Sequence, residues 1–212
     1  MKRNANDAAR ACGLAAQRGK RAAMADALTP AFHLETPAGE DRERRVCDHC
    51  GWTDYRNPRI VVGSVVTWTP SGEGAEPRFL MCRRAIEPRR GFWTLPAGFM
   101  ETGESVRDAA RREAREEAEC DIRIDAVLAM YDVVHVQQVQ MMFRATLAEP
   151  VFSAGPESLE VRLFGWDEIP WEEIAFPSVR WALGHWREAR GLATFPPFGN
   201  PADAPDGGAE PA

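Results

Sequence analysis

The feature that most constrains the fold is residues 98–120, GFMETGESVRDAARREAREEAEC, where a loop punctuated by glycine runs directly into a helical pattern. Ser105 can cap a helix that extends from about Val106 to Ala118. A stripe of small side chains on this helix would allow close packing on a sheet: Val106, Ala110, Ala114 and Ala118. The segment therefore predicts a helix laid against a sheet, with a tight loop leading into it.

Three glutamates crowd the same helix, namely Glu113, Glu116 and Glu117. They fall within about a 100° sector, where like charges repel by a few tenths of a kcal/mol per pair. Arg112 lies four residues before Glu116, whereas Glu113 and Glu117 have no cation on their own helix face. Burying an unpaired carboxylate is costly, so a divalent cation is a natural partner. A solvated charged face and a buried, satisfied carboxylate are the alternatives.

The rest of the chain is rich in strand patterns. Residues 59–68 and 79–84 are apolar runs joined by a glycine-rich stretch, which predicts a hairpin. Three later segments also have strand character: 121–134, 136–147 and 161–166. A second helix is expected over about 178–189. Many strands with two helices favour a mixed sheet covered by helices.

Composition divides the chain into four parts. Residues 1–30 form a basic, alanine-rich leader, unless translation begins at Met24. Residues 31–57 hold a short cysteine-containing hairpin, and 58–190 are long enough for one catalytic-size domain. Residues 191–212 are rich in Pro, Gly and Ala, which is typical of a disordered tail.

Charge and cysteine usage narrow the functional classes. The net charge of −6 argues against a broad nucleic-acid-binding surface, but it allows small anionic substrates held through a metal. No apolar run approaches the roughly 18 residues of a membrane span, so no membrane partner is expected. Five cysteines, an odd number, suit a reducing cytoplasm.

Residues 98–120 resemble the signature of the Nudix hydrolases. The signature is matched at eight positions: Gly98, Glu104, Arg112, Glu113, Ala114, Glu116, Glu117 and Cys120. It departs at Glu119, where the family has a glycine that ends the helix. The resemblance implies an α/β fold, a Nudix-like α/β/α sandwich with a mixed β-sheet, preceded here by a partial zinc-ribbon hairpin.

The resemblance also implies roles for the residues that match. The implied ligands of Mg²⁺ or Mn²⁺ are a loop carbonyl near Ala97 and the carboxylates of Glu113, Glu116 and Glu117. Glu104 would be held by Arg112 and so fix the loop against the helix, although acids near a helix N-terminus are favourable anyway. On charge alone, Glu113 and Glu117 are the first choice as the metal pair, and Glu116 could be a ligand or the base.

The resemblance extends beyond the signature. Residues 45–186 look most like the Nudix group that carries an N-terminal zinc ribbon and includes plant-type FAD pyrophosphatases. This resemblance positions Glu157 and Glu160 near the metal face. Glu160 is counted among the catalytic residues as a candidate general base, with Glu116 as an alternative. Three aromatic residues could present a flat surface to a substrate ring, with core packing as the alternative: Trp93, Phe99 and Tyr131.

Cys47 and Cys50 form half of a zinc ribbon, whereas a closed structural zinc site needs four ligands. His33 and His49 could contribute, and Cys12 lies far into the leader. The preferred interpretation is a hairpin that keeps the cysteine spacing but binds no metal. The alternative is a hairpin that binds Zn²⁺.

The expected function is hydrolysis of a nucleoside diphosphate linked to another moiety, of the FAD, ADP-ribose or NADH type, into two monophosphates. The alternative is a Nudix module that binds nucleotides as a sensor without catalysis. The expected partner is a small-molecule nucleotide in the cytoplasm, and a homodimer is compatible with these expectations.

Overall fold

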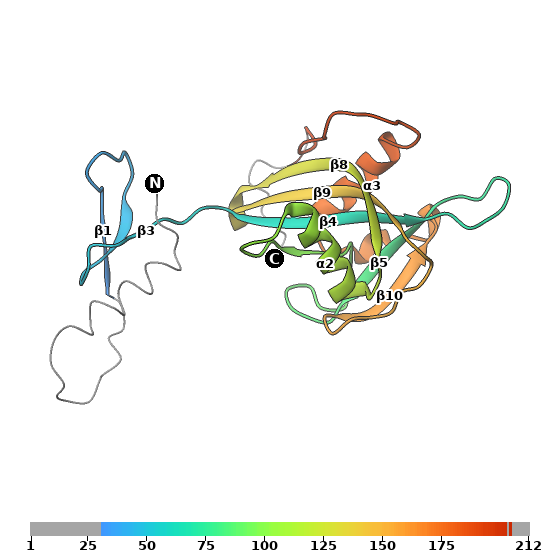
Figure 1. Cartoon of the computed structure of the whole chain (residues 1–212), viewed down its shortest axis with the longest axis horizontal. Coiled ribbons are helices and arrows are strands. Elements are labelled where there is room, and N and C mark those ends of the chain that lie inside the picture. The colour runs from blue at the N-terminus through green and yellow to red at the C-terminus, as the bar shows by residue number, and fades with distance from the viewer. Residues whose placement is uncertain (1–30, 203, 205–212) are drawn as a thin grey trace. The chain divides into compact units, whose positions relative to one another are not determined.

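The computed structural model describes residues 31–202 and 204 (Figure 1), and these form two compact units that divide after Asn57. The predicted leader, with Met24 and Cys12, lies outside the described residues, as does the end of the predicted tail. Within the described part of the chain, no helix is long and apolar enough to cross a membrane.

The N-terminal unit is a small antiparallel sheet rather than a simple hairpin. Its strands are β1 (Phe32–Glu35), β2 (Arg44–Cys47) and β3 (Thr53–Asp54), in that order across the sheet. β2 lies in the centre and pairs with both neighbours. The cysteine pair therefore begins where the central strand ends.

The second unit contains a mixed sheet of seven strands. Its main path runs β10 (Ser158–Phe164), β5 (Arg78–Arg84), β4 (Arg59–Trp68), β9 (Gln138–Leu147) and β8 (Ile122–Val133). The short strands β6 (Trp93–Thr94) and β7 (Ala97–Phe99) pair with β5 and β4. β4 and β9 are parallel, and the other pairs on the path are antiparallel.

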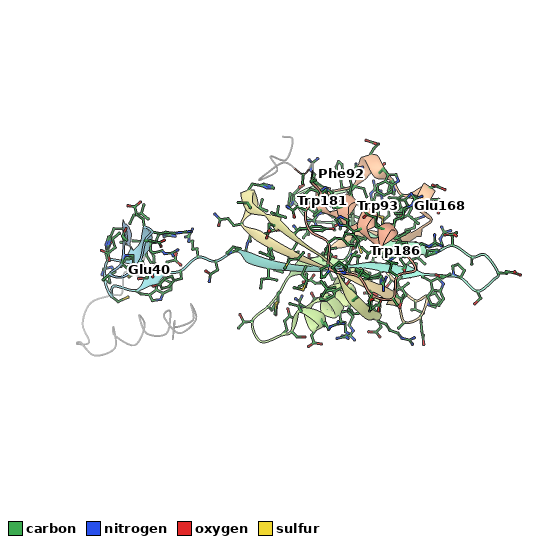
Figure 2. The ribbon with its side chains drawn as sticks, turned by 90° about the horizontal axis from the view of Figure 1, so that it is seen from above. Glu40, Phe92, Trp93, Glu168, Trp181 and Trp186 are labelled. Atoms are coloured by element: carbon green, nitrogen blue, oxygen red, sulfur yellow. The ribbon has the colours of Figure 1, made fainter. Side chains whose placement is uncertain are left out.

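Two helices cover opposite faces of this sheet (Figures 1 and 2), which confirms the predicted α/β/α layering. They are α2 (Val106–Ala118) and α3 (Pro177–Glu188), and short 3-10 helices complete the unit: η2 (Val134–Val136), η3 (Trp166–Glu168) and η4 (Trp171–Glu173). Alternation along β5 separates two cores, because Phe79 packs on the α3 side and Leu80 on the α2 side.

Helix α2 has the predicted bounds and the predicted cap. The Oγ of Ser105 accepts a hydrogen bond from the backbone N–H of Asp108 at 3.2 Å, and Ser105 itself is extended. The small stripe is fully buried at Ala110, Ala114 and Ala118. Local signals therefore sufficed to place this helix, because cap and stripe lie within the segment itself.

The helix ends at Glu119, where the family signature has glycine. Glu119 adopts the left-handed conformation with φ of 45°, which is unfavourable for a residue with a Cβ atom. Its carboxylate accepts a hydrogen bond from the Ser153 hydroxyl, and the Ser153 N–H donates to the Ala118 carbonyl at 3.0 Å. The helix exit is thus held by one side-chain and one backbone contact from Ser153, at a position where the family has glycine.

Replacing Glu119 with glycine should raise the free energy of unfolding by about 1 kcal/mol, or roughly 2–4 °C in Tm, because the left-handed strain disappears. Glu119→Ala is the matched control, since it keeps the strain and loses the exposed Ser153 contact. Chemical denaturation of both variants measures the difference. A glycine variant no more stable than the alanine variant would contradict this explanation of the helix exit.

The predicted disordered tail requires correction at its beginning. Phe198 forms a parallel bridge with Ala129 of β8: its N–H donates to the Leu128 carbonyl at 2.9 Å and its carbonyl accepts from the Met130 N–H at 2.9 Å. Its ring stacks on His185 of α3 at 4.5 Å. Proline and glycine content suggested disorder, but the aromatic residues of this stretch give it a surface to bury.

Candidate active site

The three glutamates of α2 differ sharply in burial. Glu113 is 7% exposed and Glu117 is 6% exposed, whereas Glu116 lies in water. The helix turns the first two toward the short strand β7, so two carboxylates share a poorly solvated environment. A solvated charged face therefore describes Glu116 but not its two neighbours.

Arg112 is the cation that contacts most of this group. Its Nη1 donates to Glu113 at 2.7 Å and to Glu116 at 2.8 Å. Its Nε and Nη2 donate to the two Glu104 oxygens at 3.1 and 2.7 Å, and Nη2 also donates to the Phe99 carbonyl at 3.0 Å. The expected Arg112–Glu104 contact is present. Glu113 has no cation three or four residues away on its own helix face, as expected, but the long side chain of the adjacent Arg112 reaches sideways to it.

Glu117 is the most perturbed carboxylate. Burial raises its pKa to about 8, although the Ala97 N–H donates to its Oε2 at 3.0 Å and lowers the pKa in part. Burial also raises the pKa of Glu113, against the opposing hydrogen bond from Arg112. The negative charges of Glu113 and Glu157 also raise the pKa of Glu117. The site therefore has more negative charge than its cations balance.

Two glycines let backbone approach these carboxylates. A Cβ atom on Gly98 would lie 2.3 Å from the Glu113 Oε2, so the backbone of β7 crosses directly over that carboxylate. A Cβ atom on Gly155 would lie 1.8 Å from the Glu116 carbonyl oxygen, and the Gly155 N–H donates to the Glu117 carbonyl at 3.1 Å. Gly155 is not among the site residues expected from sequence, since a Gly-Pro pair signals a turn but not its contact with a distant helix.

The structure separates the two acids considered for the general base. Glu157 contributes to the raised pKa values of both Glu113 and Glu117, so it lies within electrostatic reach of the buried pair. Glu160, on β10, instead faces Arg83 with 4.0 Å between Oε2 and Nη1. The expected placement near the metal face therefore describes Glu157 better than Glu160.

Two of the three aromatic candidates belong to the core. Trp93 is 5% exposed and packs edge-on against Phe164 at 4.8 Å, among the labelled aromatic residues of Figure 2. Tyr131 is 0% exposed, and its hydroxyl is 2.7 Å from the His185 Nδ1. This corrects the expectation of a substrate surface at these two positions, because neither ring has a free face.

Phe99 behaves differently. Its ring is 44% exposed, and the guanidinium of Arg59 lies 4.3 Å from the ring centroid. The Phe99 carbonyl is held by Arg112, so the residue is anchored by its backbone while its ring faces outward. Of the three aromatic candidates, it is the one able to meet a ligand.

The carboxylates fit a hard divalent cation by chemistry and by charge. Within residues 31–202 and 204, no three carboxylate, imidazole or thiol groups converge as a formed cation site. The reason lies in their contacts, because Glu113 is turned to Arg112 and Glu117 to the Ala97 amide. Two buried carboxylates with raised pKa values are nevertheless the oxygen donors that Mg²⁺ and Mn²⁺ prefer.

The described residues of the N-terminal unit, 31–57, do not bring four zinc ligands together. Cys47 is buried and Cys50 is exposed. Of the two histidines considered, His33 is committed to acids: its Nδ1 lies 2.6 Å from Asp48 and its Nε2 lies 3.1 Å from Glu35. A closed structural zinc site needs four ligands, so the described residues of this unit do not complete one.

Comparison with protein-family profiles gives two matches. The NUDIX domain profile matches residues 58–182, and a Nudix N-terminal profile named for its zinc ribbon matches residues 29–56. A solved structure of a NUDIX hydrolase from Nitrosomonas europaea shares 40% sequence identity, with a TM-score of 0.72. The similarity covers 83% of this chain and 97% of that one.

Two curated proteins are also similar. One is an ADP-ribose pyrophosphatase from Methanocaldococcus jannaschii, 25% identical over 141 residues, which are 61% of this chain and 78% of that protein. The other is the NAD-capped RNA hydrolase NudC of Stutzerimonas stutzeri, 30% identical over 125 residues. That match covers 58% of this chain but only 42% of the relative, so less than half of NudC has a counterpart here.

Proposed function

The chain belongs to the Nudix family and is a hydrolase of the pyrophosphatase type, and from that premise we propose that ADP-ribose or a similar dinucleotide-like compound is its substrate. Cleavage would yield two monophosphates. The observation that carries this proposal is the buried pair Glu113 and Glu117, held beside Arg112 and Glu104. The name of the Methanocaldococcus relative favours ADP-ribose over FAD or NADH.

Nudix hydrolases generally use divalent metals, and here Glu113 and Glu117 would hold the ion, with Glu116 and the carbonyl near Ala97 as further ligands. When bound, the ion supplies charge neutralisation for the pyrophosphate and Lewis acidity. The ligand carboxylates need no large movement of α2, since they already lie on one side of a helix packed on the sheet.

The chain's own residues would perform three tasks. Arg112 keeps the loop against α2 through Glu104 and the Phe99 carbonyl, so the ligands stay in place. Glu157 would accept the proton of the attacking water on its carboxylate. Phe99 would offer its exposed ring to the base of the substrate.

The test is turnover of ADP-ribose, FAD and NADH by the purified protein with Mg²⁺ or Mn²⁺, with the products separated by chromatography. We expect AMP and ribose 5-phosphate from ADP-ribose, and no reaction in EDTA. Cleavage of none of the three would overturn the proposal. Tight nucleotide binding that is unaffected by EDTA, without turnover, would favour a sensor.

The choice of base can be tested with two matched substitutions. Glu157→Gln should lower kcat about 100-fold, because general-base catalysis typically contributes at least that much. Glu160→Gln should change kcat less than about 3-fold, since its partner is Arg83. Both are measured at saturating Mg²⁺, and a larger loss in Glu160→Gln than in Glu157→Gln would reverse the assignment.

We also propose that the N-terminal unit keeps its fold without zinc. Glu40 joins two parts of this unit, because it accepts hydrogen bonds from Arg44 Nε at 2.9 Å and from the Tyr55 hydroxyl at 2.5 Å (Figure 2). The Arg45 guanidinium lies 4.6 Å from the Phe32 ring centroid. These contacts, with the backbone pairs of three strands, would take over what a metal provides in a zinc ribbon.

Purified protein should therefore contain less than about 0.1 equivalent of zinc, because residues 31–57 do not assemble four ligands. Elemental analysis by mass spectrometry measures this directly. A second experiment measures the thermal unfolding of the whole chain with and without a zinc chelator. The unfolding temperature should be the same in both. One equivalent of zinc per chain, or unfolding of this unit by the chelator, would contradict the proposal.

A further inference from the structure

A cavity of about 500 Å³ lies on the α3 side of the sheet, at the beginning of β5. Its walls include Phe79 of β5, Trp166 of η3 and Trp186 of α3. Figure 2 shows Trp186 and Glu168 on the side of the sheet that α3 covers, with α2 on the opposite side. A cavity of this volume is of the size that small-molecule sites have.

The cavity is separate from the carboxylate site. Arg84, at the far end of β5, pairs with Ser158, close to the Gly155 turn that packs on α2. Phe79 lies near the other end of β5. At a rise of about 3.3 Å per residue, the backbones of Phe79 and Arg84 are roughly 15–20 Å apart, and so are the two sites beside them. They also face opposite sides of the sheet, because Phe79 belongs to the α3-side core.

The aromatic wall of the cavity is rigid. The Trp166 ring packs edge-on against Phe79 at 5.6 Å and against Trp171 at 5.1 Å. Trp186 packs on the same Phe79 ring at 4.8 Å. Because neighbouring rings fix each ring, the wall offers a preformed apolar surface to a flat ligand.

Most charges at the cavity are already paired. Arg78 donates to Glu168 at 2.6 Å, and Arg190 lies 2.7 Å from Glu76. Arg187 is different: its guanidinium lies 4.7 Å from the Trp166 ring centroid, and among the described residues it makes no ion pair. Its donors therefore remain available to an anion, next to the aromatic wall.

We propose that this cavity binds a planar aromatic ring joined to one anionic group, of mononucleotide size, with the ring against Trp166 and the anion on Arg187. The guanidinium can donate two parallel hydrogen bonds to a phosphate. Of the carboxylates that line the cavity, Glu168 and Glu76 are each balanced by an arginine, whereas Asp167 makes no ion pair among the described residues and so opposes the anion. A nucleoside monophosphate belongs to this class, and the proposed reaction would release one.

The experiment is calorimetric titration of the full chain in EDTA with AMP, adenosine and ribose 5-phosphate. AMP should bind at least about 10-fold more tightly than either of the others, because each of those lacks one half of the recognised group. Arg187→Gln should weaken AMP binding at least about 10-fold. Arg56→Gln, which removes the same charge from the N-terminal unit, should leave it unchanged.

Binding is measured without metal or turnover, so the result does not depend on the proposed hydrolysis. Arg187→Gln should also unfold cooperatively at close to the wild-type temperature, which shows that the variant is folded. AMP binding as tight in Arg187→Gln as in wild type would overturn the proposal. So would adenosine binding as tightly as AMP, or an absence of AMP binding to wild type.

Discussion

Glu117→Gln is expected to lower kcat at least about 100-fold, which corresponds to about 2.7 kcal/mol of transition-state stabilisation. Glutamine keeps the size of the side chain and can still accept the hydrogen bond from the Ala97 N–H. It removes the charge, and a ligand of the proposed catalytic ion cannot lose its charge without consequence. The measurement is kcat with ADP-ribose at saturating Mg²⁺.

The same substitution should have the opposite effect on the stability of the metal-free protein. Burial raises the folded-state pKa of Glu117 to about 8. The folded chain thus keeps the proton to higher pH than the unfolded chain does, so the free energy of unfolding falls as pH rises from about 4.5 to about 8. Glutamine removes this contribution, whose slope is at most about 1.4 kcal/mol per pH unit. Denaturation in EDTA at several pH values measures it.

A lower kcat together with a free energy of unfolding that depends less on pH would show that the variant has lost a metal ligand and that its fold is intact. Glu101→Gln is the control, because Glu101 is an exposed carboxylate in the nearby loop between β7 and α2. It should keep both the kcat and the pH profile of wild type. Near-normal kcat in Glu117→Gln would remove Glu117 from the proposed ligands.

Gly155→Ala is expected to destabilise the protein by at least about 2–3 kcal/mol, or roughly 5–10 °C in Tm. The added Cβ atom would lie 1.8 Å from the Glu116 carbonyl oxygen and 2.8 Å from its carbonyl carbon. These are backbone atoms within the last turns of α2, so they cannot rotate away as a side chain would. Either the turn or the helix must move, and the ligands on α2 would move with the helix.

Gly184→Ala is the matched control for this substitution. Gly184 lies inside α3, and a Cβ atom there would meet nothing within 4 Å. Alanine in a helix interior should stabilise the protein by about 0.5–1 kcal/mol. Opposite signs for the two alanine substitutions are expected in thermal unfolding. A Gly155→Ala variant as stable as wild type would show that the turn is not held against α2.

The parts of the fold that sequence predicted well depend on nearby residues. Helix α2 was placed at both ends because Ser105 and the small stripe lie within the helical segment. The contact of Arg112 with Glu104 was likewise expected, from the resemblance to the Nudix signature, whose matching positions lie in one loop and helix. Features of this kind can be recognised in the sequence without knowledge of the tertiary structure.

Contacts between distant segments were harder to predict. The roles of Trp93 and Tyr131 depend on which side of the sheet each faces, and this follows from pairing over the whole sheet. Glu157 and Glu160 are three residues apart, yet the bulge at the beginning of β10 and the partner strand β5 decide which one approaches α2. Periodicity alone does not contain that information.

The bridge between Phe198 and β8 has a consequence for how the molecule meets its neighbours. β8 is the last strand on the main path of the sheet, and an outer strand presents backbone donors and acceptors to which another chain could add a strand. Phe198 uses the N–H of Met130 and the carbonyl of Leu128, and Asn200 binds both backbone groups of Asp132. The stretch that contains Phe198 and Asn200 therefore shields the sheet from edge-to-edge aggregation. The composition of the same stretch suggests disorder.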